Sequence, residues 1–254
     1  GKESIPGMYN WDDMLALGKT VSDGELKERS DRLDPDDAIM MQYTSGTTGY
    51  PKGVMLSHRN LIGNAQSMAE IMALTPDDTL CIPVPLFHCF GCVIGTMCCT
   101  VSGAAMAPVT AFTPQKVMET VDALQCTALH GVPTMFIAEL EEMDQRQYNT
   151  AALRTGVMAG STCPIEVMKG VINKMGAEEL TIVYGQTESS PGITQTRRDD
   201  PIHIRTETVG RALPNVEVKI ADPVTGEFLP QGETGELCSR GYHIMKGYYK
   251  MPEK

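Results

Sequence analysis

The most informative segment of the sequence is AIMMQYTSGTTGYPKGVML, residues 38–56. Its two ends, Ala38–Tyr43 and Gly53–Leu56, are short apolar segments that predict strands, the first of them buried. The segment 43–53 that joins them contains three glycines and four Ser or Thr hydroxyls, with Lys52 near its end. Glycines allow backbone N–H groups to approach an anion, hydroxyls add donors, and the lysine adds positive charge. We therefore predict a phosphate-binding loop.

This loop differs from the Walker loop of other nucleotide-binding proteins. Counted from Gly46, Lys52 stands where that motif has its lysine, but Pro51 replaces the second glycine and Gly53 replaces the Ser or Thr. A short strand rather than a helix follows, so we expect the loop to wrap phosphates without help from a helix dipole. The alternative is a hydrophilic hairpin linker, but the flanking apolar strands and the Pro-Lys-Gly ending favour phosphate binding.

Outward from this stretch, strand-like and helix-like segments alternate. Further strands are predicted at Thr79–Pro83, Ala128–Gly131, Gly156–Ala159 and Leu180–Tyr184, and helices up to Leu74, from Pro114, and at Pro133–Glu142 and Pro164–Met175. The pattern predicts an α/β fold with largely parallel sheets covered by helices. Short strands at Val216–Ile220 and Gly235–Arg240 predict a small β-rich subdomain after it. We expect a linker or N-terminal extension at 1–35, with a short helix at Trp11–Leu17, an α/β core at 36–204 and the β-rich subdomain at 205–254.

Composition excludes several classes of protein. The 254 residues carry a net charge of −11. A nucleic-acid binder is expected to have a basic surface, which this acidic composition does not indicate. Residues Cys92–Val109 are nearly long enough to span a bilayer, but polar residues, glycines and a proline interrupt them. We expect a buried helix running into a buried strand there, and no integral membrane segment. The chain begins at Gly1 without a signal peptide, so we expect a fragment of a longer cytoplasmic protein.

Eight cysteines in mostly apolar surroundings predict buried free thiols in a reducing compartment. Cys89 and Cys92 have C-x-x-C spacing, but no second pair at matching spacing supports a zinc site. A redox role would need that pair to open a helix in a thioredoxin-like unit. Packing explains the cysteines better.

Three ordered motifs resemble the adenylate-forming superfamily of acyl-CoA synthetases, luciferases and adenylation domains. They are the loop at 43–53, the YGQTE sequence at 184–188, and TVGRALP at 208–214 with later glycine-rich signatures at 235–237 and 247–249. The resemblance covers residues 36–254. It is closest to medium-chain fatty acyl-CoA synthetases, through residues 129–136 and 241–245.

The resemblance implies a site for ATP or AMP, magnesium and coenzyme A. Thr44, Ser45, Gly46, Thr47, Thr48, Gly49 and Lys52 would cradle the β- and γ-phosphates. Tyr184, followed by Gly185 and Gln186, would stack on adenine, and Thr187 would bond the α-phosphate. Glu188 and Thr44 would hold Mg²⁺, and Gly160, Ser161 and Thr162 would lie against adenine and acyl group. Read alone, Thr187 and Glu188 are an ordinary helix start; placed after Tyr184 at a strand end, they favour the site.

The acid to be activated is expected to be aliphatic. The family places its acid pocket near residues 85–91, and the resemblance assigns Phe87, His88 and Val132 to the acyl side. No acidic residue occurs between Asp78 and Glu119 to pair with the ammonium of an amino acid, and an unpaired buried ammonium is costly. His88 has an equally weighted alternative as a hydrogen-bonded core histidine.

The predicted function is therefore ligation: a carboxylic acid, here a fatty acid, and ATP give acyl-adenylate and pyrophosphate, followed by transfer to coenzyme A. Lys52, Thr187 and Glu188 would stabilise charge on the phosphates. Two alternatives stay open, a nucleotide-binding module without turnover and a phosphotransferase that cuts at the γ-phosphate. Activation of an aryl or amino acid and assembly as a homodimer also stay open. The ribose-binding aspartate and the C-terminal lysine of the family pattern cannot be assigned within these 254 residues, so the fragment alone is expected to be inactive.

Overall fold

The computed structural model describes residues 5–44 and 50–253 and divides the chain into two units, Gly1–Asp37 and Ala38–Lys254. The first unit contains two short helices, α1 (Trp11–Gly18) and α2 (Asp23–Asp31). Each begins at a capping box, formed by Asn10 with Asp13 and by Ser22 with Glu25. The predicted helix at 11–17 is present. Helix α2 was not predicted from the sequence, because its polar residues have no apolar face and only the cap marks its start.

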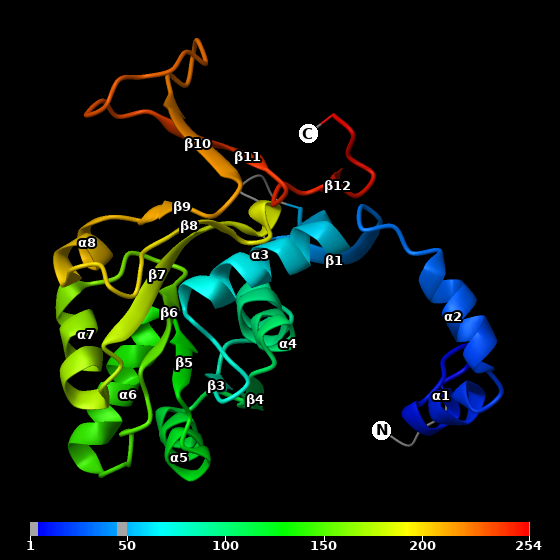
Figure 1. Ribbon diagram of the computed structural model, residues 1–254, viewed down its shortest axis with the longest axis horizontal. Coiled ribbons are helices and arrows are strands. Elements are labelled where there is room, and N and C mark those ends of the chain that lie inside the picture. The colour runs from blue at the N-terminus through cyan, green and yellow to red at the C-terminus, as the bar shows by residue number, and fades with distance from the viewer. Residues whose placement is uncertain (1–4, 45–49, 254) are drawn as a thin grey trace. The chain divides into compact units, whose positions relative to one another are not determined.

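A seven-stranded sheet forms the centre of the second unit, in the order β4-β3-β5-β6-β7-β8-β9 (Figure 1). The five strands from β4 to β7 are parallel, and β8 and β9 extend the sheet in antiparallel pairing. The predicted α/β class with a largely parallel sheet is confirmed. The strands are β3 (Thr79–Ile82), β4 (Ala105–Pro108), β5 (Ala128–Gly131), β6 (Thr155–Ala159), β7 (Glu179–Gly185), β8 (Gly192–Gln195) and β9 (Arg211–Ala212).

Helices cover both faces of this sheet (Figure 1). Neighbouring residues of one strand enter different apolar clusters, Val157 on one face and Met158 on the other, because side chains alternate along a strand. The first face is covered by α3 (His58–Ile71), the π-helix η1 (Phe90–Met97) and α4 (Cys98–Ser102). The second is covered by α5 (Pro114–Leu124), α6 (Pro133–Gln145), α7 (Ile165–Gly170) and η2 (Val171–Met175). One further helix, α8 (Ile202–Glu207), contacts α7 and β7.

The two strands that flank the predicted phosphate-binding loop belong to a separate antiparallel sheet, in the order β1-β2-β12. These strands are β1 (Ala38–Thr44), β2 (Lys52–Ser57) and β12 (Gly247–Tyr248). The prediction of a buried first strand was wrong: Gln42 is the only fully buried side chain of β1, and Tyr43 is 66% exposed. An edge position leaves one side of β1 unpaired, which the apolar composition of the strand does not reveal. The β-rich end is a hairpin of β10 (Val216–Ala221) and β11 (Glu236–Gly241).

The eight cysteines, all among the described residues, are free thiols, six of them buried. The expectation for Cys92–Val109 holds for the helix, since Cys98 and Cys99 are buried, but β4 is an edge strand with Met106 46% exposed. Over residues 5–44 and 50–253, no helix has the length and apolarity needed to cross a membrane.

Candidate functional site

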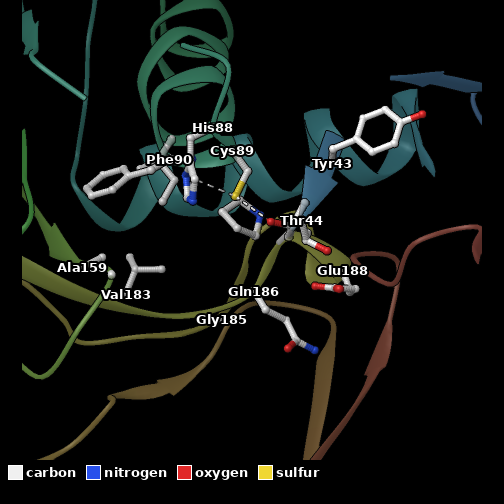
Figure 2. A pocket seen from close by; sticks show the side chains of 14 residues that line it. Tyr43, Thr44, His88, Cys89, Phe90, Ala159, Val183, Gly185, Gln186 and Glu188 are labelled. Carbon is white, nitrogen blue, oxygen red and sulfur yellow. Dashed lines mark hydrogen bonds between the residues drawn. The ribbon is translucent and has the colours of Figure 1, made fainter. Parts of the chain in front are cut away.

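A cavity of about 550 Å³ opens where β6 and β7 end. Ligands of open α/β sheets bind outside the carboxyl ends of the strands, and this volume suits a small molecule. Four segments distant in sequence enclose it: the end of β1, the start of η1, the end of β6, and the end of β7 with the following turn (Figure 2). The lining residues are Tyr43, Thr44, His88, Cys89, Phe90, Ile94, Ala159, Gly160, Val183, Gly185, Gln186, Thr187, Glu188 and Pro191.

The turn after β7 presents the polar wall of this cavity. It is the short 3₁₀ helix η3 (Thr187–Ser189). A side chain at Gly185 would place its Cβ 1.8 Å from the Pro191 carbonyl oxygen, so only glycine fits there. The Gln186 N–H donates to the same carbonyl at 2.9 Å, which closes the turn. Thr187 and Glu188 follow at the cavity's edge, both half-buried.

His88 and Cys89 form the facing wall. The Phe90 N–H donates to His88 Nδ1 at 3.0 Å, which places the proton of a neutral imidazole on Nε2. Burial lowers the pKa of His88, so the neutral ring persists at neutral pH. The Nε2–H group is then a donor suited to a carboxylate or carbonyl oxygen. Beside it, Cys89 Sγ lies 3.8 Å from His88 Nδ1 (Figure 2). The same sulfur lies 3.6 Å from Oγ1 of Thr187.

Glu188 is fixed by a residue far along the chain. Its Oε1 accepts a 2.8 Å hydrogen bond from the Tyr248 hydroxyl, and its backbone carbonyl accepts from the Met245 N–H at 3.0 Å. The Lys52 Nζ lies 4.5 Å from the centre of the same Tyr248 ring. Lys52 does not line the cavity itself, but its ammonium and the Glu188 carboxylate both contact the Tyr248 side chain.

Oxygen donors of Thr44 and Glu188 face the same cavity. Within the part of the chain that the structure describes, no group of three or more His, Cys, Asp or Glu side chains is arranged to hold a metal. A complete protein cage is thus not built from these residues. One carboxylate and one hydroxyl fit magnesium instead, because Mg²⁺ keeps several waters and is commonly completed by substrate phosphates.

The structure brings seven of the predicted site residues to the cavity and leaves others outside it. Those on its lining are Thr44, His88, Gly160, Gly185, Gln186, Thr187 and Glu188. The predicted phosphate ligands Ser45, Gly46, Thr47, Thr48 and Gly49 lie outside the described residues.

The remaining predicted residues are placed around the site. Phe87 is 86% exposed and does not line the cavity, and Ser161 and Thr162 are exposed beside it. Val132 packs behind the site, 3.1 Å from where a Cβ on Gly160 would lie. Tyr184, 42% exposed, lines a second cavity of about 580 Å³ that shares Gln186 and Glu188 with the first.

Two residues of the site, Cys89 and Tyr248, were not predicted from the sequence as functional candidates. Cys89 was considered only as half of a C-x-x-C pair, although it follows His88 directly and shares its loop. Tyr248 was noted only within a glycine-rich signature. Its partner Glu188 lies 60 residues earlier, and no local pattern signals a contact across that separation.

The chain matches one protein family over nearly its whole length. The family model described as "AMP-binding enzyme" matches residues 6–249. YngI of Bacillus subtilis (strain 168) is 60% identical over 98% of this chain and 46% of its own length. The "Medium-chain acyl-CoA ligase ACSF2, mitochondrial" of Macaca fascicularis is 38% identical over 98% of this chain and 41% of its own length.

A solved structure shares the fold. ATP-bound MatB from Rhodopseudomonas palustris superposes with a TM-score of 0.78 at 32% identity, over 87% of this chain and 43% of that chain. The chain thus spans less than half the length of each of these relatives.

Proposed function

The chain belongs to the AMP-binding enzyme family, and from that membership we propose that it is the adenylating part of an acyl-CoA ligase. The observation that carries the proposal is the two-sided cavity. One wall holds the oxygens of Thr44, Thr187 and Glu188, and the other holds His88 with the apolar side chains of Phe90 and Ile94. A site that joins a phosphoanhydride to a carboxylic acid needs both kinds of wall.

In the proposed reaction, a carboxylate oxygen attacks the α-phosphorus of ATP. The bond from that phosphorus to the pyrophosphate oxygen breaks, and acyl-adenylate and pyrophosphate form. The thiol of coenzyme A then attacks the acyl carbon, and AMP leaves with the oxygen that came from the acid. Phosphoryl and nucleotidyl transfer depend on positioning and charge stabilisation more than on covalent help from the protein.

The residues divide between these tasks. Thr44 to Gly49 and Lys52 would bind the β- and γ-phosphates, and Thr187 the α-phosphate. Tyr184, Gly185, Gln186 and the segment 160–162 would surround the adenine and ribose side. Glu188 and Thr44 would hold Mg²⁺, which supplies charge neutralisation when bound. The His88 Nε2–H group would donate to the acid and hold its carboxylate in line with the α-phosphorus.

An aliphatic acid is the substrate class that the lining supports. Phe90, Ile94, Ala159 and Val183 are apolar, and the carboxylate among the described lining residues is Glu188, which the proposal assigns to Mg²⁺. The ammonium of an amino acid would therefore have no carboxylate of its own to pair with, and an unpaired buried ammonium is costly. The name of the ACSF2 relative, a medium-chain acyl-CoA ligase, agrees with this choice. We propose medium-length straight-chain acids.

Pyrophosphate exchange tests the proposal. The full-length protein would be assayed for acid-dependent ATP–pyrophosphate exchange with acetate through palmitate, several amino acids and benzoate. Each buried methylene contributes about 0.8 kcal/mol, so kcat/KM should rise about fourfold per carbon until the pocket is filled. Release of orthophosphate without exchange would indicate a phosphotransferase, and binding of ATP without any product a module without turnover. A flat alkyl series, or an amino acid or benzoate ranked first, would contradict the substrate class alone.

A further inference from the structure

Residues 244–249 form a crossing segment that ties two parts of the site together. Its Met245 N–H donates to the carbonyl of Glu188 at 3.0 Å. Its Lys246 N–H donates to Met55 at 2.9 Å, and its Tyr249 N–H donates to Gly53 at 2.8 Å, both on β2. Within it, β12 pairs with β2 in antiparallel register. The crossing segment therefore fixes the η3 turn, with Glu188, relative to β2, with Lys52.

Tyr248 repeats this connection with its side chain. The hydroxyl donates to Glu188 Oε1 at 2.8 Å while the ring lies 4.5 Å below the Lys52 ammonium. A hydrogen bond to a charged carboxylate is shorter and stronger than one between neutral groups. A cation over an aromatic face is attracted by the ring quadrupole. One half-buried side chain thus contacts both charged residues that the proposed function assigns to phosphate and metal.

The ring also separates two opposite charges. Lys52 and Glu188 form no direct ion pair in the described structure, and each instead contacts Tyr248. A direct pair would occupy both groups and would have to break before a nucleotide phosphate or a metal ion could bind. With Tyr248 between them, Glu188 keeps a defined carboxylate orientation and Lys52 keeps its N–H donors available.

We propose that Tyr248 is a positioning residue for adenylation, which orients Glu188 through its hydroxyl and Lys52 through its ring. This inference rests on the proposed function, in which Glu188 serves the metal ion and Lys52 the phosphates. The two contacts come from different parts of one side chain, so they can be removed one at a time. Tyr248→Phe removes the hydroxyl and keeps the ring, whereas Tyr248→Leu removes both.

Magnesium-dependent ATP binding, measured by calorimetry without any acid present, is the test. It uses the full-length protein and reads binding rather than turnover. In Tyr248→Phe, the Mg²⁺ concentration that half-saturates the enhancement of ATP affinity should rise roughly tenfold, because loss of a group that orients a metal ligand typically weakens metal affinity by 10–100-fold. Tyr248→Leu should also weaken ATP binding without metal. Tyr249→Phe is the matched control, since Tyr249 contacts Lys250 at 5.2 Å and does not contact Glu188, and it should stay within twofold of wild type.

A double-mutant cycle separates positioning from a general structural effect. If Tyr248 acts through Glu188, adding Tyr248→Phe to Glu188→Gln should cause no further rise in the Mg²⁺ requirement. An equal rise in both backgrounds, or a Tyr248→Phe variant that matches wild type, would overturn the inference. If the ATP affinity of the wild-type protein does not depend on the Mg²⁺ concentration, the proposed metal site is wrong. If pyrophosphate exchange does not require an acid, the proposed function is wrong.

Discussion

Cys89 Sγ lies 3.6 Å from Thr187 Oγ1, so two residues separated by 98 positions in sequence are in contact at the candidate site. Cys89 is buried, and burial raises the pKa of its thiol, which keeps it neutral as a weak hydrogen-bonding partner. The contact restrains the hydroxyl that the proposed function directs at the α-phosphate.

Removing this thiol should impair catalysis modestly. Cys89→Ala is expected to lower adenylation kcat/KM about two- to thirteenfold, the range of one lost hydrogen bond of about 0.5–1.5 kcal/mol. Cys92→Ala removes a half-exposed thiol of η1, the helix that follows Cys89, which does not line the cavity, and it should remain within twofold of wild type. Equal effects from the two variants would show that Cys89 acts only in packing.

Two lysines that each lie over a tyrosine allow a matched comparison. Lys52→Ala should lower acid-dependent pyrophosphate exchange at least tenfold, because a charge-assisted contact of about 1.5–3 kcal/mol is lost. Lys250→Ala removes the lysine over Tyr249, outside the site, and should leave the rate unchanged. Glu188→Gln should lower the rate of pyrophosphate exchange by a similar factor to Lys52→Ala. Wild-type rates in both site variants would refute their assignment.

His88 should affect the acid more than the nucleotide. His88→Ala is expected to raise KM for the acid at least tenfold and KM for ATP less than threefold, since its Nε2–H group is directed to the carboxylate. Because the pKa of His88 is lowered, its imidazole stays neutral to a lower pH than an ordinary histidine. The decrease of kcat/KM that its protonation causes should therefore occur below pH 6.5. His203→Ala, on the exposed surface of α8, serves as the control. A purely structural His88 would shift both KM values alike.

Glu139 predicts a pH dependence of stability. It is fully buried on α6, neither of its carboxylate oxygens has a hydrogen-bond partner among the residues that the structure describes, and burial raises its pKa to about 8. The folded state therefore holds a proton that the unfolded state releases near pH 4.5. The associated stability is present below pH 4.5 and is lost as the pH rises through 8, on the order of 5 kcal/mol.

Urea unfolding at pH 5, 7 and 9 checks this sign. Glu139→Gln, which stays neutral, should gain stability relative to wild type as the pH rises and little at pH 5. Glu141→Gln changes an exposed carboxylate of the same helix and should show no such trend. A stability difference for Glu139→Gln that is independent of pH would mean that the carboxyl is charged or solvated in the folded protein.

Local patterns predicted most strands and helices of the second unit because their signals are short-range. The helix from Pro114 has a capping hydroxyl at Thr113 and proline at its first position, and the parallel strands are continuous apolar runs. Burial of β1 was predicted wrongly because β1 stands at the edge of its sheet, while the third strand, Gly247–Tyr248, pairs with the other side of β2. The α2 helix was missed because its residues form no apolar face.

In the candidate site, too, local signals were predicted from the sequence and long-range contacts were not. Thr187 and Glu188 could be placed by their position after a strand, and the resemblance supplied their roles. The contacts of Cys89 with Thr187 and of Tyr248 with Glu188 join distant segments, so only the fold reveals them. The resemblance assigned Phe87 to the acyl side; it directly precedes His88 in the chain, but its side chain is exposed and does not line the cavity.

The most direct test of the central claim follows one oxygen atom. The full-length protein would be supplied with ATP, coenzyme A and octanoate labelled with ¹⁸O in its carboxylate, and the AMP formed would be analysed by mass spectrometry. Attack of the carboxylate on the α-phosphorus, followed by thiol attack on the acyl carbon, requires one ¹⁸O atom in each AMP molecule. Unlabelled AMP, or label appearing in orthophosphate, would contradict adenylation of the acid at this site.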